Sequence, residues 1–255
     1  MTTLIAWGNI HTSFPFHDIP ADLIPANLLT LSHGNPRMQQ RWQCRRLAHF
    51  LLWQLLKTAE KPTALLGQIS RTKSDRPQFP SSELDFNISH SGDWVAVILH
   101  ISQPGKKSAV GIDIESPSKE RPYLALLEHF ASTEEINWFQ QQTESQSAFY
   151  RIWCLREAVL KSQGVGIAKL SEVTHQPETL HIFSAHCPRG QLCFTDELPF
   201  YLAYFVNQES SILPQCFVWS EHAFVSQQMP DSVCYKVNSS NKIEKIRSRS
   251  HISKI

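Results

Sequence analysis

The stretch Val110–Glu115, "VGIDIE", places two carboxylates inside an otherwise apolar segment. Because alternate side chains of a β-strand point to opposite faces, Gly111, Asp113 and Glu115 would share one face and the three branched residues the other. The two carboxylates would then lie about 7 Å apart along the strand. Like charges on a half-buried face repel each other and lose hydration, and a hard cation with oxygen ligands relieves both problems. A surface strand with a polar outer face is the alternative.

The composition of the whole chain is that of a globular protein. The chain has 255 residues, 42% hydrophobic and 18% charged, which suffices for one large domain or two small ones with a real core. Six Lys or Arg residues and one Glu give residues 236–255 a charge of +5, which leaves −4 for the first 235 residues of a chain with net charge +1. This balance neither favours nor excludes a nucleic-acid partner, and we expect none.

The six cysteines, at positions 44, 154, 187, 193, 216 and 234, form no Cys-x-x-Cys pair. The spacing resembles neither a zinc site nor a disulfide framework, so we expect free thiols in a reducing compartment. No leader pattern begins the sequence, and no apolar run approaches the roughly 18 residues that span a bilayer. We therefore expect a cytoplasmic protein, monomeric and without a membrane partner.

Outward from the acidic strand, the pattern predicts helices alternating with groups of strands. Strands are expected at 3–8, 84–89, 94–101 and 108–115, the last two joined through "QPGKK" as a hairpin, and a long helix at 33–60 with Asn35 as its cap and Pro36 in its first turn. Ser132 and Glu135 match a capping box. A second helix, 146–163, precedes strands at 180–186, 190–195, 199–207 and 215–219.

This order predicts an α+β fold of two similar halves related by a pseudo-twofold axis, with a ligand site between them. The N-terminal half would cover residues 1–112 and the C-terminal half 113–235. Residues 236–255 would form a basic, disordered tail.

The helix at 146–163 supplies a third carboxylate. Trp153, Glu157 and Lys161 fall at steps of four and so form one stripe on a helix that is otherwise largely apolar. An ordinary salt bridge between Glu157 and Lys161 is one interpretation. The other is that Glu157 faces the cation beside the acidic strand, because buried charges need partners.

Two further groups are candidates for binding an anion. Basic side chains at steps of four on the first helix could follow several phosphates or form a solvated face: Arg37, Arg41, Arg45 and His49. In "NISHSGDW", Ser89, His90 and Ser91 combine hydroxyls and an imidazole that suit a phosphate. No P-loop, dinucleotide-binding glycine motif or serine-hydrolase elbow is present in the sequence.

Taken in order, "FNISHSGDWV", "VGIDIE" and "WCLREAVLK" resemble the motifs of the 4′-phosphopantetheinyl transferase superfamily, in its single-chain, surfactin-synthetase-activating form. The motifs cover residues 86–166. The resemblance implies a pseudo-twofold α+β fold that binds coenzyme A and Mg²⁺ between its halves.

The resemblance also implies roles for individual residues. Asp113, Glu115 and Glu157 would bind the metal. Contacts to coenzyme A would come from five side chains: Ser89, His90 at the 3′-phosphate, Lys161 at the pyrophosphate, Arg46 on the first helix, and Arg76 beside the adenine. Arg156 stands where the family more often has Lys, which puts its role in doubt.

The implied reaction moves phosphopantetheine from coenzyme A to a serine of an apo acyl or peptidyl carrier protein and releases adenosine 3′,5′-bisphosphate. Glu157 would act as the general base and Lys161 would stabilise the leaving phosphate. Two other functions use the same residues: a Mg²⁺-dependent hydrolase of the coenzyme A pyrophosphate, and a non-catalytic coenzyme A or carrier-binding protein.

Overall fold

The computed structural model describes residues 1–30, 34–118, 121–208 and 213–239. It is a mixed α+β fold, as predicted. A five-stranded sheet has the strand order β12-β11-β1-β5-β4, and a six-stranded sheet has the order β6-β10-β9-β13-β8-β7. A small pair, β2-β3, completes the strands.

The elements have the following bounds. The first sheet contains β1 (Thr2–Asn9), β4 (Leu84–Ser91), β5 (Trp94–Ile101), β11 (Gln215–Ser220) and β12 (Ala223–Gln227). The second contains β6 (Val110–Glu115), β7 (Thr174–Gln176), β8 (His181–Phe183), β9 (Gly190–Thr195), β10 (Tyr201–Val206) and β13 (Val233–Asn238). The pair is β2 (Ser70–Arg71) and β3 (Pro77–Gln78). The α-helices are α1 (Ala26–Leu29), α2 (Pro36–Thr58), α3 (Tyr123–Leu127), α4 (Thr133–Gln140) and α5 (Ser145–Lys161). Four 3₁₀ helices are η1 (Phe16–Asp18), η2 (Ala21–Leu23), η3 (Thr63–Gln68) and η4 (Ile167–Glu172).

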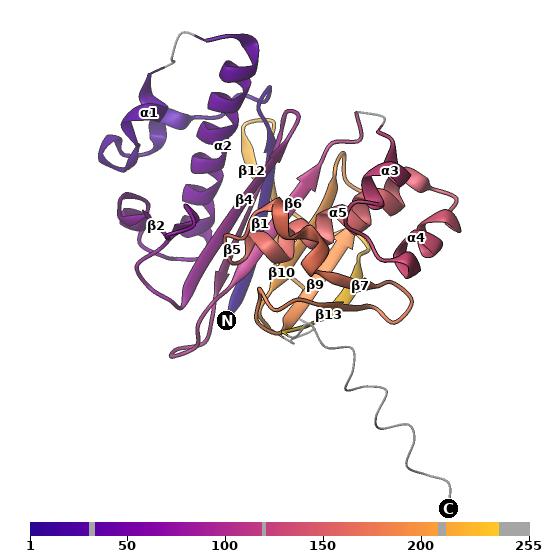
Figure 1. Cartoon of the computed structure of the whole chain (residues 1–255). Coiled ribbons are helices and arrows are strands. Elements are labelled where there is room, and N and C mark those ends of the chain that lie inside the picture. Colours follow the sequence, from indigo (N-terminus) through magenta and orange to yellow (C-terminus); the bar gives the residue numbers. More distant parts are fainter. Residues whose placement is uncertain (31–33, 119–120, 209–212, 240–255) are drawn as a thin grey trace, which may run out of the picture.

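The two sheets pack face to face between two outer helices, α2 on the first sheet and α5 on the second (Figure 1). Strand β1 shows how the alternation of its side chains builds two cores. Leu4 and Ala6 pack towards α2, whereas Ile5 and Trp7 pack between the sheets. The third core lies between α5 and the second sheet.

The two main helices begin and end much as the sequence predicts. The Asn35 side chain caps α2 by accepting a hydrogen bond from the Met38 N–H, and Pro36 is the first helical residue. Ser132 and Glu135 form the predicted capping box at the start of α4. Helix α5 ends at Lys161, and Gly164 follows with a φ of 68° that favours glycine.

The predicted hairpin between the strands at 94–101 and 108–115 is wrong. The hairpin partner of β5 is β4, through a turn at Gly92 with φ 56°, and β6 instead pairs antiparallel with β10 in the other sheet. The "QPGKK" segment therefore crosses from one sheet to the next. Apolar alternation is the same for both pairings, so the sequence did not separate them.

Two strands near the C-terminus complete the first sheet. β11 pairs parallel with β1, and β12 pairs antiparallel with β11 at the edge. The first sheet therefore contains strands from both sides of the predicted boundary between residues 112 and 113. This boundary also falls inside β6. Of the predicted tail, residues 236–238 belong to β13, and residues 240–255 lie outside the described part of the chain.

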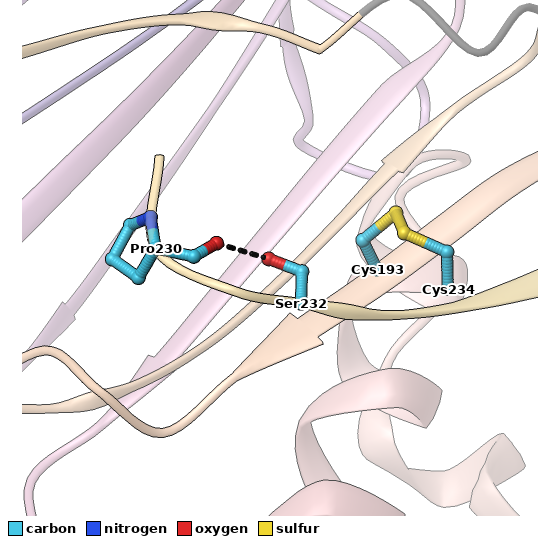
Figure 2. Close-up of a disulfide and its surroundings, with 4 residues drawn as sticks. All are labelled: Cys193, Pro230, Ser232 and Cys234. Carbon is cyan, nitrogen blue, oxygen red and sulfur yellow. Dashed lines mark hydrogen bonds between the residues drawn. A yellow bond between two sulfur atoms is a disulfide. The ribbon is translucent and has the colours of Figure 1, made fainter. Parts of the chain in front are cut away.

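The expectation that all cysteines are free thiols is wrong for one pair. Cys193 on β9 and Cys234 on β13 are direct partners across the antiparallel strands, with Cα atoms 4.1 Å apart, and form a disulfide (Figure 2). Just before β13, the Ser232 hydroxyl donates to the Pro230 carbonyl. The four other cysteines are buried and free. The pair was missed because the strand register brings together residues 41 positions apart.

Within the described ranges, no helix is long and apolar enough to cross a bilayer.

Candidate active site

The site is set by the close approach of α5 to β6, and Gly111 is the residue that allows it. A Cβ atom added at Gly111 would lie 1.9 Å from the carbonyl oxygen of Ala158 in α5. The branched side chains of β6 fill the core between the sheets. Asp113 and Glu115, on the same face as Gly111, therefore meet the helix that carries Glu157 and Lys161.

Asp113 is the centre of the polar contacts. Its side chain is 4% exposed, and Oδ1 lies 2.5 Å from Lys161 Nζ and accepts a hydrogen bond from the Ser89 hydroxyl at 3.1 Å. Lys161 also lies 3.9 Å from the Glu157 carboxylate, so the predicted salt bridge within the helix exists but is the longer of its two ion pairs. Burial by itself would lower the pKa of Lys161, but the two carboxylates raise it.

The other two carboxylates are held in surroundings that disfavour their charge. Burial, followed by repulsion from Asp113, raises the pKa of Glu157 to about 7. The same causes raise the pKa of Glu115, although a hydrogen bond from Ser91 acts in the opposite direction. Glu157 can therefore exchange a proton near neutral pH.

The described part of the chain contains no set of three or more His, Cys, Asp or Glu side chains already arranged around a metal position. Two observations nevertheless fit a cation at the carboxylates. Asp113 Oδ2 is buried without a hydrogen-bond partner among the described residues. The mutual repulsion that raises the pKa of Glu115 and Glu157 is what a divalent ion would relieve.

Arg76 fixes the position of these elements relative to each other. Its guanidinium makes two hydrogen bonds of 2.8 Å to the Asp85 carboxylate on β4. It also donates to the carbonyls of Lys161, at the end of α5, and of Val110, at the start of β6. With further contacts to the carbonyls of Pro77 and Phe86, all its N–H groups have acceptors, so the structure gives this predicted coenzyme A ligand a structural position.

His90 lies near basic side chains of α2. Loss of hydration and then the positive charges of Lys161, Arg41 and Arg45 lower its pKa. Arg46 instead stacks on the rings of Phe16 and Trp42, with its guanidinium carbon 4.1 and 4.5 Å from their centroids. The structure thus brings His90 near Arg41 and Arg45, two members of the stripe at steps of four.

A cavity of about 530 Å³ opens between α2, α1 and β4. Its walls are mostly apolar, and the charged or basic side chains among its lining residues are Arg45, Arg71, His49, His90 and Asp22. A cavity with apolar walls and a few cations suits a flat base next to a phosphate.

Arg156, the departure from the family pattern, does not reach the site. It is fully buried, with one guanidinium nitrogen 2.5 Å from Glu135 and another donating to the Leu170 carbonyl. Glu135 in turn contacts His175, at 3.0 Å. These three residues connect α4, α5 and β7 to one another.

Comparison with known proteins shows the family of the chain. Residues 109–222 match the 4′-phosphopantetheinyl transferase superfamily. Over 238 residues the chain is 58% identical to a Haemophilus influenzae protein named "Putative 4′-phosphopantetheinyl transferase", which covers 93% of this chain and 100% of that protein. Over 95 residues it is 35% identical to 4′-phosphopantetheinyl transferase Sfp of Bacillus subtilis, covering 36% of this chain and 38% of Sfp.

This similarity over nearly the whole chain shows a group-transfer enzyme, and the chain belongs to the 4′-phosphopantetheinyl transferase superfamily. The resemblance seen in the three sequence motifs is therefore confirmed, as is the enzyme class, a phosphopantetheinyl transferase.

Proposed function

We propose that this protein transfers the 4′-phosphopantetheine group of coenzyme A to a serine of an apo acyl or peptidyl carrier protein, with Mg²⁺, and releases adenosine 3′,5′-bisphosphate. The observation that carries the proposal is the meeting of Asp113, Glu157 and Lys161 where α5 crosses β6. The neighbouring cavity, largely apolar and lined by Arg45 and Arg71, supports coenzyme A as the donor.

The donor would lie where the first sheet with α2 meets the second sheet with α5. His90, with Arg41 and Arg45, would bind the 3′-phosphate, because cations and N–H donors converge there. The apolar cavity would take the adenine base. Lys161 would then lie at the pyrophosphate, close to Asp113.

The reaction is a substitution at the phosphorus that bears the pantetheine arm. The serine oxygen forms a bond to this phosphorus as the bond to the leaving phosphate breaks. Glu157 would take the serine proton, and Lys161 would stabilise the charge that develops on the leaving group. Mg²⁺, held by Asp113, Glu115 and Glu157, would supply further neutralisation of the pyrophosphate.

The test is the intact mass of an apo carrier protein after incubation with coenzyme A, Mg²⁺ and this protein. A phosphopantetheine adduct together with released adenosine 3′,5′-bisphosphate supports the proposal. Free phosphopantetheine without an adduct, across a panel of fatty-acid, polyketide and peptide carriers, would instead indicate a hydrolase. An unchanged carrier and unchanged coenzyme A would indicate a binding protein.

A further inference from the structure

The edge of β4 is joined to the edge of β6 by side chains in place of a backbone ladder. Alternate residues of β4 each accept a hydrogen bond from a backbone N–H on β6 or just after it. The four pairs are Asp85 with Val110, Asn87 with Ile112, Ser89 with Ile114, and Ser91 with Ser116, at 2.9–3.1 Å. We call these four β4 side chains the seam.

The two serines of the seam each make a second hydrogen bond, to a carboxylate of the site. A hydroxyl can accept one hydrogen bond and donate another. The Ser91 hydroxyl accepts from the Ser116 N–H at 3.0 Å and donates to Glu115 Oε2 at 2.9 Å. Ser89 makes the equivalent pair of contacts, with Ile114 and Asp113.

Asn87 offers a contrast within the same seam. Its side-chain oxygen accepts from the Ile112 N–H at 3.0 Å, and no hydrogen bond from Asn87 to a site carboxylate occurs among the described residues. Of the four seam side chains, Ser89 and Ser91 also bind carboxylates of the site, Asp85 also binds Arg76, and Asn87 makes only the seam contact within the described part of the chain.

We propose that Ser91 is a positioning residue for Glu115: its hydroxyl fixes one carboxylate oxygen and so orients the group for the metal. This inference rests on the proposed metal site. Hydrogen bonds to a ligating carboxylate fix its orientation, and losing such a partner typically weakens metal binding about 10- to 100-fold. Glu115 depends on this support more than Asp113, which Lys161 also holds.

The experiment measures Mg²⁺ binding to the full chain by calorimetry, without coenzyme A, and thermal stability in parallel. Ser91→Ala should weaken Mg²⁺ binding about tenfold or more. Ser91→Thr, which keeps the hydroxyl, should restore it. Asn87→Ala should lower the melting temperature through the lost seam contact while leaving Mg²⁺ affinity close to that of the wild type.

The outcomes separate this inference from the proposed function. If the wild type binds Mg²⁺ and Ser91→Ala binds it equally well, the positioning role is wrong and the metal site stands. Equal weakening by Ser91→Ala and Asn87→Ala would mean that the seam acts only on the fold, which also overturns the inference. A wild type that binds no Mg²⁺ would overturn the metal site together with the role of Ser91.

Discussion

The ammonium of Lys161 lies 2.5 Å from Asp113 Oδ1, which joins the last turn of α5 to the acidic strand β6. This ion pair offsets part of the repulsion among three carboxylates that would otherwise be crowded together without a cation. It uses only one of the Asp113 oxygens. The other, Oδ2, is buried without a hydrogen-bond partner in the described part of the chain, and it is the atom that we assign to Mg²⁺.

Gly111→Ala should move α5, which carries Glu157 and Lys161, away from the carboxylates of β6. The new methyl group would overlap the Ala158 carbonyl, a backbone atom that cannot move without shifting α5. We expect a loss of about 3 kcal/mol in the free energy of unfolding and loss of transfer activity. Gly166→Ala is the control, because nothing lies within 4 Å of the added methyl. Equal stability and activity of the two variants would show that the approach of α5 to β6 is looser than described.

His90→Ala and Arg45→Ala should each weaken use of coenzyme A more than use of dephospho-coenzyme A. Each removes a charged or hydrogen-bonding contact to the 3′-phosphate, worth about 1.5–3 kcal/mol, or about 10- to 100-fold in kcat/KM. Arg46→Ala should leave the ratio between the two donors unchanged, because Arg46 stacks on Phe16 and Trp42. Steady-state kinetics with both donors checks this, and a loss that is the same for both would remove His90 from the 3′-phosphate.

Between about pH 7.5 and about pH 5, His100, with its pKa lowered to about 4, and Glu157, with its pKa raised to about 7, act on stability in opposite directions. A further contribution, which should fall as the pH is lowered, comes from His175. Burial lowers the pKa of this residue from 6.5 to about 4, against the opposing effect of Glu135. The unfolded chain therefore takes up a proton below pH 6.5 that the folded protein binds only near pH 4, so folding loses on the order of 1–2 kcal/mol at pH 5. Glu135, with its pKa lowered to about 2, adds a further loss only at lower pH.

Denaturant unfolding at the two pH values tests this assignment. His175→Gln removes the imidazole of His175, so the change in its stability from pH 7.5 to pH 5 should be less unfavourable than that of the wild type. His17→Gln, at an exposed position, should keep the wild-type difference. The assignment fails if His175→Gln retains the full pH dependence.

Thiol counting tests the disulfide. Protein denatured without reductant should react with a thiol reagent at four cysteines, and at six after reduction, because Cys193 and Cys234 are bonded and the other four are free. Peptide mapping should recover the 193–234 linkage. Six reactive thiols without reductant would contradict the pairing.

The sequence predicted best the features that depend on local pattern. The period of two in "VGIDIE" placed Asp113 and Glu115 on one face, and the period of four placed Glu157 and Lys161 on one helical stripe. The caps at Asn35 and Ser132 also followed from local chemistry. Features that depend on how distant segments pair could not be derived in this way.

The pairing of β6 with β10, the return of β11 to β1 and the disulfide all depend on sheet register between distant segments. The stacking of Arg46 on Phe16 likewise joins two segments that are distant in the sequence. Arg156 was conspicuous in the sequence because the family more often has Lys there, yet its partner Glu135, and His175 beyond it, come from other elements.

The most direct test of the account is the appearance of holo-carrier, followed by intact mass in the presence of coenzyme A and Mg²⁺, with the wild type and Glu157→Gln compared at equal concentrations of folded enzyme. Glu157→Gln removes one charge from the crowded carboxylates, so the variant should fold at least as well as the wild type. The account predicts a phosphopantetheine adduct with the wild type and none above background with Glu157→Gln. Adduct formation by Glu157→Gln at the wild-type rate would contradict the site described above.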